Sequence, residues 1–161
     1  MGLEFFHDGK SPYNIDLSGL SVIDIGGGPT SLLLKGVGFL GANVIDPISL
    51  PSWVYARYTA AGIGVWTMQA ENMPTESKFD EAWIYNVLQH TEDPALIIQN
   101  AQKIAGLIRI FEWIDTPTNI GHIHTLTEEN LNKWLGGYGK VEQIAERNCF
   151  GKAYYGIFPT S

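Results

Sequence analysis

Ser21-Val-Ile-Asp-Ile-Gly-Gly-Gly-Pro29 is the stretch that decides the fold. Its β-branched residues up to Ile25 predict a buried strand. The three glycines that follow predict a tight turn, where a ligand can approach the backbone closely because no Cβ intervenes. Pro29 favours the first turn of a helix, which we expect to continue to Lys35. A strand, a glycine turn and a helix in this order are typical of a parallel α/β sheet.

Strands and helices continue to alternate along the chain. Further strands are predicted at residues 42–46, 64–69, 80–85 and 107–114, with two last strands at residues 141–146 and 153–158. The last two strands are predicted to form an antiparallel hairpin around a turn at residues 148–151. Together with the strand that ends at Ile25, the chain therefore supplies seven strands.

Three more helices are predicted between these strands. One begins near Pro51, and a second begins at Pro94 with Asp93 as its N-cap. A third is expected after Thr125, because Thr125 and Glu128 form a capping-box pattern. The sequence thus predicts one α/β domain over residues 1–161, with a doubly wound, mostly parallel, seven-stranded sheet, helices on both faces and a C-terminal antiparallel hairpin.

Composition excludes several classes of protein. The 161 residues are 45% hydrophobic and 17% charged, which is a globular composition. Ten Lys and Arg against 17 Asp and Glu give a net charge of −7, which disfavours nucleic acid as the main partner. Cys149 is the only cysteine, so an internal disulfide and a Cys-rich zinc site are excluded. We find neither a membrane span nor a signal peptide, and expect a soluble cytoplasmic protein without a metal site.

Polar residues at the strand ends mark the expected ligand site, because ligands bind beyond the carboxyl ends of the strands in such sheets. Asp46 ends the second predicted strand, about twenty residues after the glycines, where an acidic residue can accept hydrogen bonds from both hydroxyls of a ribose. Asp46 could equally be a turn residue before Pro47. The glycine turn nearby favours the ribose interpretation.

These features fit a nicotinamide enzyme or a methyltransferase, and three details favour the second. Ser31 stands where the dinucleotide fingerprint has its third glycine. Asp24 lies two residues before the first glycine, where a carboxylate suits an ammonium group better than a pyrophosphate. The fourth predicted strand is followed by Asn86-Val-Leu-Gln-His-Thr-Glu-Asp-Pro94.

With these motifs the sequence resembles the class I S-adenosylmethionine-dependent methyltransferases, which have a Rossmann-like fold. Val22-Ile-Asp-Ile-Gly-Gly-Gly-Pro-Thr30 looks like their first motif, and Val44-Ile-Asp46 looks like the acidic motif of their second strand. Gln69-Ala-Glu-Asn-Met-Pro74 is similar to their loop after the third strand. The block from Phe79 to Pro94 looks like their fourth-strand motif. The four motifs occur in the family's order, between about Val22 and Ile114.

The resemblance implies S-adenosylmethionine as cofactor and assigns a role to eight residues. The glycine turn would cradle the methionine part, Asp24 would help to hold its ammonium group, and Asp46 would bind the ribose. Gln69 and the backbone N–H of Ala70 would face the adenine, and the backbone of Asn86 would lie near the methionyl end. The implied cofactor-binding residues are Asp24, Gly26, Gly27, Gly28, Asp46, Gln69, Ala70 and Asn86. Gln69 departs from the family, since many members have Asp there.

Catalysis by methyl transfer depends mainly on positioning, and a general base is needed only if the acceptor arrives protonated. The candidates are His122 and His124 in Gly121-His-Ile-His124, and His90 in the fourth-strand motif. If the segment is extended, its two imidazoles point the same way. One of them could instead only order the approach to the next helix. The five tryptophans are expected in the core, with Trp113 at a strand end as the exception.

The predicted function is a methyltransferase that acts on a small molecule, by N- or O-methylation. Two alternatives remain: a cofactor-binding subunit without activity of its own, and, less favoured, a nicotinamide-dependent oxidoreductase. Only about 20 residues precede the first predicted strand, where the family often places substrate-covering helices. We therefore expect an open substrate site, or one that a second copy or another partner completes.

Overall fold

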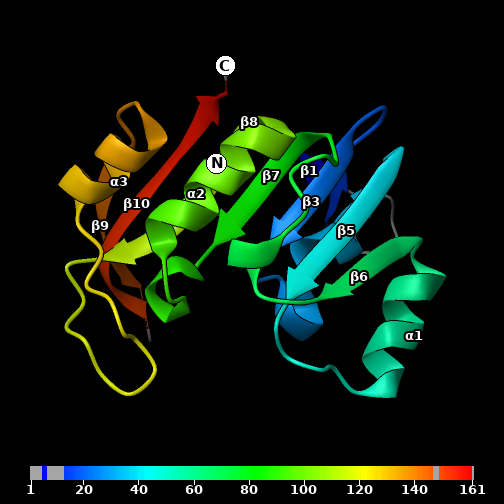
Figure 1. Cartoon of the computed structure of the whole chain (residues 1–161), viewed down its shortest axis with the longest axis horizontal. Helices are drawn as coiled ribbons and strands as arrows, with labels where there is room; N and C mark the ends of the chain where they lie inside the picture. Colours follow the sequence, from blue (N-terminus) through cyan, green and yellow to red (C-terminus); the bar gives the residue numbers. More distant parts are fainter. Residues whose placement is uncertain (1–4, 7–12, 147–148, 161) are drawn as a thin grey trace.

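The computed structural model describes residues 5–6, 13–146 and 149–160. Its main sheet has seven strands in the order β6-β5-β3-β7-β8-β10-β9 (Figure 1). They are β3 (Ser21–Ile25), β5 (Gly41–Asp46), β6 (Ile63–Thr67), β7 (Phe79–Tyr85), β8 (Ala105–Ile114), β9 (Lys140–Glu146) and β10 (Cys149–Pro159). All neighbouring pairs are parallel except those that β10 makes with β8 and β9. The predicted sheet and its antiparallel hairpin are confirmed.

Three α-helices cover the two faces of this sheet, as predicted. They are α1 (Ser52–Ala60), α2 (Pro94–Ile104) and α3 (Glu128–Leu135). Apolar residues of α2 and α3, such as Ile97 and Leu131, form one buried core with Ile23 of β3. Val54 of α1 belongs to a second core with Val22 of β3. Because successive side chains of a strand point to opposite faces, α1 lies on the face opposite to α2 and α3. Among the described residues, no helix is long and apolar enough to cross a membrane.

The expected helix from Pro29 to Lys35 is wrong. The chain forms two 3₁₀ turns instead, η1 (Gly28–Thr30) and η2 (Leu32–Lys35). Between them Ser31 has an extended backbone, with φ −49° and ψ 143°. The side chain of Ser31 donates to Asp24 and its N–H donates to the hydroxyl of Tyr58, so Ser31 is held out of a helical conformation. A sequence pattern of strand, glycines and Pro29 gives no sign of these contacts.

The helix starts are partly confirmed. Asp93 is the N-cap of α2, and its carboxylate accepts from Leu96 N at 2.9 Å. The N-cap of α3 is Thr127, not Thr125, and its hydroxyl accepts from Asn130 N at 3.2 Å. The hydroxyl of Thr125 donates to the Thr116 carbonyl at 2.9 Å instead, which keeps this segment extended for two more residues.

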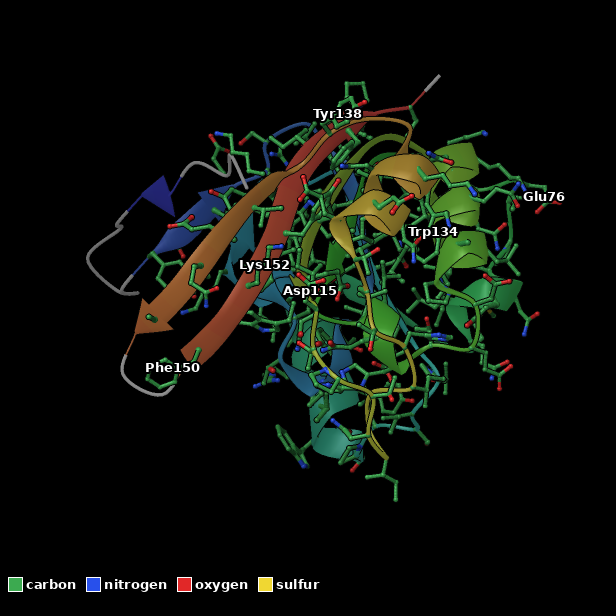
Figure 2. All side chains as sticks on the ribbon, turned by 90° about the vertical axis from the view of Figure 1, so that its left-hand side faces the viewer. Glu76, Asp115, Trp134, Tyr138, Phe150 and Lys152 are labelled. Carbon is green, nitrogen blue, oxygen red and sulfur yellow. The ribbon has the colours of Figure 1, made fainter. Side chains whose placement is uncertain are left out.

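A second, three-stranded sheet was not predicted. It consists of β1 (Phe5–Phe6), β2 (Asn14–Asp16) and β4 (Gly36–Val37), in the order β1-β2-β4. Figure 2 views the molecule from the β9 edge of the main sheet, with α3 on one side and β1 on the other. The predicted turn at residues 148–151 is wrong for residues 149–151, which belong to β10, and residues 147–148 lie outside the described residues.

Candidate functional site

Two pockets lie on either side of the glycine turn, at the carboxyl ends of the parallel strands. The first, of about 480 Å³, is called the Asp46 pocket here, and the second, of about 400 Å³, the Asp24 pocket. The Asp46 pocket is lined by Ile25, Gly26, Ile45, Asp46, Pro47, Ile48, Gln69, Ala70, Glu71, Asn86, Val87, His90, Thr91 and Glu92. The Asp24 pocket is lined by Asp24, Gly26, Gly27, Thr30, Ser31, Leu32, Tyr85 and Phe111. Gly26 belongs to both, so the turn forms the boundary between them.

The glycines of this turn are required by its geometry. Gly26 has a φ of +74°, and a Cβ on it would overlap the side chain of Val87. A Cβ on Gly27 would lie only 2.6 Å from Asp24 Oδ2. The absence of side chains here lets the turn sit directly against β3 and leaves the backbone open to both pockets.

Asp46 holds the glycine turn through its carboxylate. Asp46 Oδ2 accepts from Gly28 N at 3.1 Å, and Asp46 Oδ1 accepts from Ile48 N at 2.9 Å. Asp46 therefore is a turn residue, which is the alternative role that the sequence left open. Each carboxylate oxygen has a second lone pair, so these bonds leave capacity for the hydroxyls of a ligand in the Asp46 pocket.

Asp24 is a buried carboxyl in the wall of the other pocket, with 3% of its surface exposed. Ser31 Oγ donates to Asp24 Oδ2 at 2.5 Å. Burial raises the pKa of Asp24 to about 7, while the Ser31 hydrogen bond acts in the opposite direction. Tyr58 of α1 braces the same turn, because its hydroxyl donates to the Gly28 carbonyl at 2.6 Å. Sequence reasoning missed the roles of Ser31 and Tyr58, which only the folded chain brings to the turn.

The segment after β7 lines the Asp46 pocket. Asn86 has a φ of 57°, which is unusual for a residue with a side chain, and its N–H donates to the Phe111 carbonyl at 2.7 Å. Glu112 of β8 accepts from both Val87 N and Leu88 N. Burial raises the pKa of Glu112 to about 8, against the effect of these two backbone hydrogen bonds.

The loop after β6 places Gln69 and Ala70 at the outer wall of the Asp46 pocket. Gln69 is exposed, and its side-chain carbonyl accepts from Asn72 Nδ2 at 3.3 Å. Ala70 is buried and begins the 3₁₀ turn η3 (Ala70–Asn72). The structure thus brings seven of the eight predicted cofactor residues to the two pockets, and the eighth, Gly28, is joined to them through its bond to Asp46.

Two of the three candidate histidines contact each other. His90, in η4 (Leu88–His90), lines the Asp46 pocket, and its ring centroid lies 4.8 Å from that of His122. His90 Nδ1 lies 2.5 Å from the Gly121 carbonyl and donates to it, and His90 Nε2 lies 3.5 Å from Gln89 Nε2. His122 and His124 are half-buried on either side of the exposed Ile123, as an extended segment requires. His124 Nε2 lies 3.1 Å from the Glu92 carbonyl, so the ring of His124 contacts the loop before α2. His124 does not line the Asp46 pocket.

A larger groove of about 700 Å³ runs between α3 and the ends of β8 and β10. Figure 2 shows Asp115 and Lys152 side by side in it, and they form an ion pair of 2.9 Å. None of the predicted site residues lines this groove. Within the described part of the chain, no group of three His, Cys, Asp or Glu side chains is placed to hold a metal ion.

No protein-family model matches this sequence, and no curated protein is similar to it. Solved structures, in contrast, are similar over most of the chain. The 1,6-didemethyltoxoflavin-N1-methyltransferase of Burkholderia thailandensis is 14% identical, with a TM-score of 0.67 over 89% of this chain and 72% of that one. The N-methyltransferase NodS of Bradyrhizobium japonicum is 18% identical, with a TM-score of 0.68 over 89% and 87%.

A third neighbour is the magnesium protoporphyrin IX methyltransferase of Synechocystis, whose structure contains bound S-adenosylmethionine. It is 16% identical, with a TM-score of 0.62 over 90% of this chain and 72% of that one. The chain therefore has the fold of the class I S-adenosylmethionine-dependent methyltransferases, as the sequence motifs predict.

Proposed function

We propose that this protein is an S-adenosylmethionine-dependent methyltransferase that acts on a small molecule, by N- or O-methylation. The observation that carries the proposal is the glycine turn between two pockets, with Asp46 in one and Asp24 in the other. This arrangement suits a ligand with a hydroxylated sugar at one end and an ammonium group at the other. Structural neighbours that are methyltransferases by name support it.

The Asp46 pocket fits the adenosine part of the cofactor. Ile45 and Ile48 supply apolar surface for a flat base, and the free lone pairs of Asp46 would accept from the ribose hydroxyls. The exposed amide of Gln69 stands at the rim, where its carbonyl would accept from the adenine amino group. This bond lacks the charge assistance that an aspartate would give.

The Asp24 pocket fits the methionine part. Gly26 and Gly27 expose backbone to it, and the carboxyl of Asp24 would hold the ammonium group directly or through water. A cation at this position favours the ionised form of Asp24 and lowers its raised pKa. We therefore expect cofactor binding to release a proton from Asp24 at neutral pH.

Bound S-adenosylmethionine supplies an electrophilic methyl group on its sulfonium. The chain would place an acceptor in line with that methyl group, and most of the rate gain would come from this positioning. His90 is the best placed base, because it is the candidate histidine that lines the Asp46 pocket, its Nδ1 is held by the Gly121 carbonyl and its ring packs against His122. His90 Nε2 would take the proton of an acceptor that arrives protonated.

Calorimetry with S-adenosylhomocysteine and with NAD and NADP tests the cofactor. We expect S-adenosylhomocysteine to bind, and neither dinucleotide to compete with it. Tight dinucleotide binding without any response to S-adenosylhomocysteine would overturn the proposal in favour of an oxidoreductase.

A second candidate function is a cofactor-binding subunit that needs a partner for activity. Half-buried aromatic side chains on the sheet face beside the Asp24 pocket favour it, since another chain could cover them. Transfer of radiolabelled methyl groups to a panel of small metabolites separates the two. Transfer by the chain alone supports the enzyme, whereas transfer only after a cellular extract is added supports the subunit.

A further inference from the structure

Three aromatic residues form a row across neighbouring strands of the main sheet. Tyr85 of β7 pairs with Phe111 of β8, and Phe111 pairs with Tyr155 of β10. Residues in register on adjacent strands point to the same face, so the three side chains stand side by side; we call them the aromatic row. Trp113 continues it along β8, with its ring centroid 5.4 Å from that of Phe111 at an interplanar angle of 86°.

The aromatic row lies outside both buried cores. Phe111 and Tyr155 are half-buried and belong to neither core, and Tyr85 packs only at the margin of the core that contains α1. The helices α2 and α3 cover the opposite face, and α1 packs against β6. Within the described residues, no α-helix covers the row, and its rings offer apolar surface on the face of the main sheet that also carries the second sheet (Figure 2).

This surface is continuous with the Asp24 pocket. Tyr85 and Phe111 line the pocket together with Gly26 and Gly27 of the glycine turn. A molecule that stacks on Phe111 would therefore reach the turn along which the cofactor is proposed to lie. We therefore expect an acceptor on the row to approach the sulfonium methyl group from the side of the Asp24 pocket.

The hydroxyl of Tyr85 adds a polar contact to this surface. It is buried, and it has no hydrogen-bond partner among the described residues. Burial, with a smaller effect of the Asp24 charge, raises the pKa of Tyr85 above its usual range, so the hydroxyl remains a donor. An unpaired buried hydroxyl is costly, and an acceptor atom of a ligand would remove that cost.

The charges around the row disfavour an anionic ligand. Asp24 is the only carboxylic acid among the residues that line the pocket, and no Lys, Arg or His lines it. The nearby Arg109 is paired with Glu81 at 2.7 Å, and Tyr155 donates to Glu142 at 3.0 Å. Within the pocket, a carboxylate or phosphate would meet the carboxyl of Asp24 and no lining cation, whereas a neutral or cationic ring would not be repelled by Asp24.

We infer that the methyl acceptor is a flat aromatic molecule, neutral or cationic, that stacks on Phe111 beside the glycine turn and accepts a hydrogen bond from Tyr85. This inference rests on the proposed methyltransferase function and names the substrate class of the same site. Aromatic stacking and a single directed hydrogen bond would orient such an acceptor for in-line transfer.

Binding of three probes to the protein saturated with S-adenosylhomocysteine tests the inference. Harmane is flat and has a ring nitrogen that accepts a hydrogen bond, 2-naphthoate is flat and anionic, and decahydroisoquinoline is a saturated amine. We expect harmane to bind at least ~10-fold more tightly than the other two, because only harmane combines stacking with a matching charge. Equal binding of harmane and decahydroisoquinoline would overturn the inference.

Substitutions in the aromatic row test where harmane binds. Phe111→Ala should weaken harmane binding at least ~10-fold, and Tyr85→Phe about fivefold, while the affinity for S-adenosylhomocysteine changes little. Trp53→Ala is the matched control, because Trp53 is an aromatic residue on α1 that is 60% exposed. If Phe111→Ala does not fold, Phe111→Leu removes the ring and keeps an apolar side chain.

The outcomes separate this inference from the proposed function. If S-adenosylhomocysteine does not bind to the wild-type chain, the proposed function fails. If it binds and harmane binding is the same in wild type and in the Phe111 variants, the inference alone fails. Sedimentation of wild type and Phe111→Ala completes the test, because a dimer that the substitution dissociates would make the row a subunit interface and overturn the inference.

Discussion

Glu112 on β8 holds the backbone of Val87, which directly follows Asn86 at the end of β7. Glu112 Oε1 accepts from Val87 N at 2.9 Å and from Leu88 N at 3.0 Å. The side chain of Glu112 is completely buried, and its Oε2 has no partner among the described residues. Because Asn86 and Val87 line the Asp46 pocket, this one carboxyl fixes the floor of the site from below.

The first prediction concerns the protonation of Glu112. Burial raises its pKa from an ordinary 4.5 to about 8, so between these pH values the unfolded chain has lost the proton and the folded chain has kept it. The free energy of unfolding should therefore fall as pH rises from about 4.5 to about 8, and level off above. Glu112→Gln should remove the part of this slope that Glu112 causes and be on the order of 2 kcal/mol more stable than wild type at pH 9, in urea unfolding.

Asp24 contributes to the same slope in wild type, since its pKa is also raised by burial, to about 7. The comparison must therefore include Asp24→Asn. If Glu112→Gln unfolds with the same pH dependence as wild type, Glu112 is ionised in the folded protein and this prediction is wrong.

The second prediction concerns Asp46, whose carboxylate has both a structural and a proposed ligand role. Asp46→Ala should weaken S-adenosylhomocysteine binding by about 1–3 kcal/mol, because a charged acceptor for the ribose hydroxyls is lost. Isothermal calorimetry at a temperature where the variant is folded measures this. Glu76→Ala serves as control, since Glu76 is exposed and lies outside both pockets. Unchanged affinity in folded Asp46→Ala would remove Asp46 from the cofactor site.

The sequence predicted the sheet because its strands are marked by local patterns. Short runs with apolar residues predicted β3, β5 and β7, and the residues just after them had to meet at one edge of a parallel sheet. The roles of the eight residues assigned to the cofactor come from the family resemblance, and they stay predictions.

Contacts between distant segments could not be predicted. Ser31 breaks the expected helix because Asp24 and Tyr58 hold it, and Tyr58 is 27 residues away in the chain. Thr127 replaces Thr125 as N-cap because Thr116 holds the hydroxyl of Thr125. The contact of His90 with His122 likewise depends on how the loop after β8 folds back over η4. A single sequence does not show which distant residues contact each other.

The third prediction concerns the histidines. His90→Gln should lower the rate of methyl transfer about 10²-fold if His90 is the general base, with cofactor affinity close to wild type. The wild-type rate should fall toward acid pH, and this fall should disappear in His90→Gln. The measurement is a pH–rate profile with an acceptor that arrives protonated.

His124→Gln is the matched control for this experiment, because the ring of His124 meets the Glu92 carbonyl and does not line the Asp46 pocket. His124→Gln should change the free energy of unfolding more than it changes the rate of methyl transfer. An acidic fall of the rate that persists in His90→Gln and vanishes in His122→Gln would transfer the role of base to His122.

The last prediction separates two reasons why the first residue after β3 must be glycine. Gly26 and Gly19 have nearly the same positive φ, +74° and +79°. A Cβ on Gly19 would meet nothing within 4 Å, whereas a Cβ on Gly26 would overlap Val87. Gly19→Ala should therefore cost only the backbone strain, about 1–2 kcal/mol of unfolding free energy. Gly26→Ala should cost about 1–3 kcal/mol more, because Val87 and the segment that Glu112 holds must move. That displacement should also abolish S-adenosylhomocysteine binding in calorimetry while Gly19→Ala binds normally; equal stability and equal binding in the two variants would show that crowding at Val87 does not shape the site.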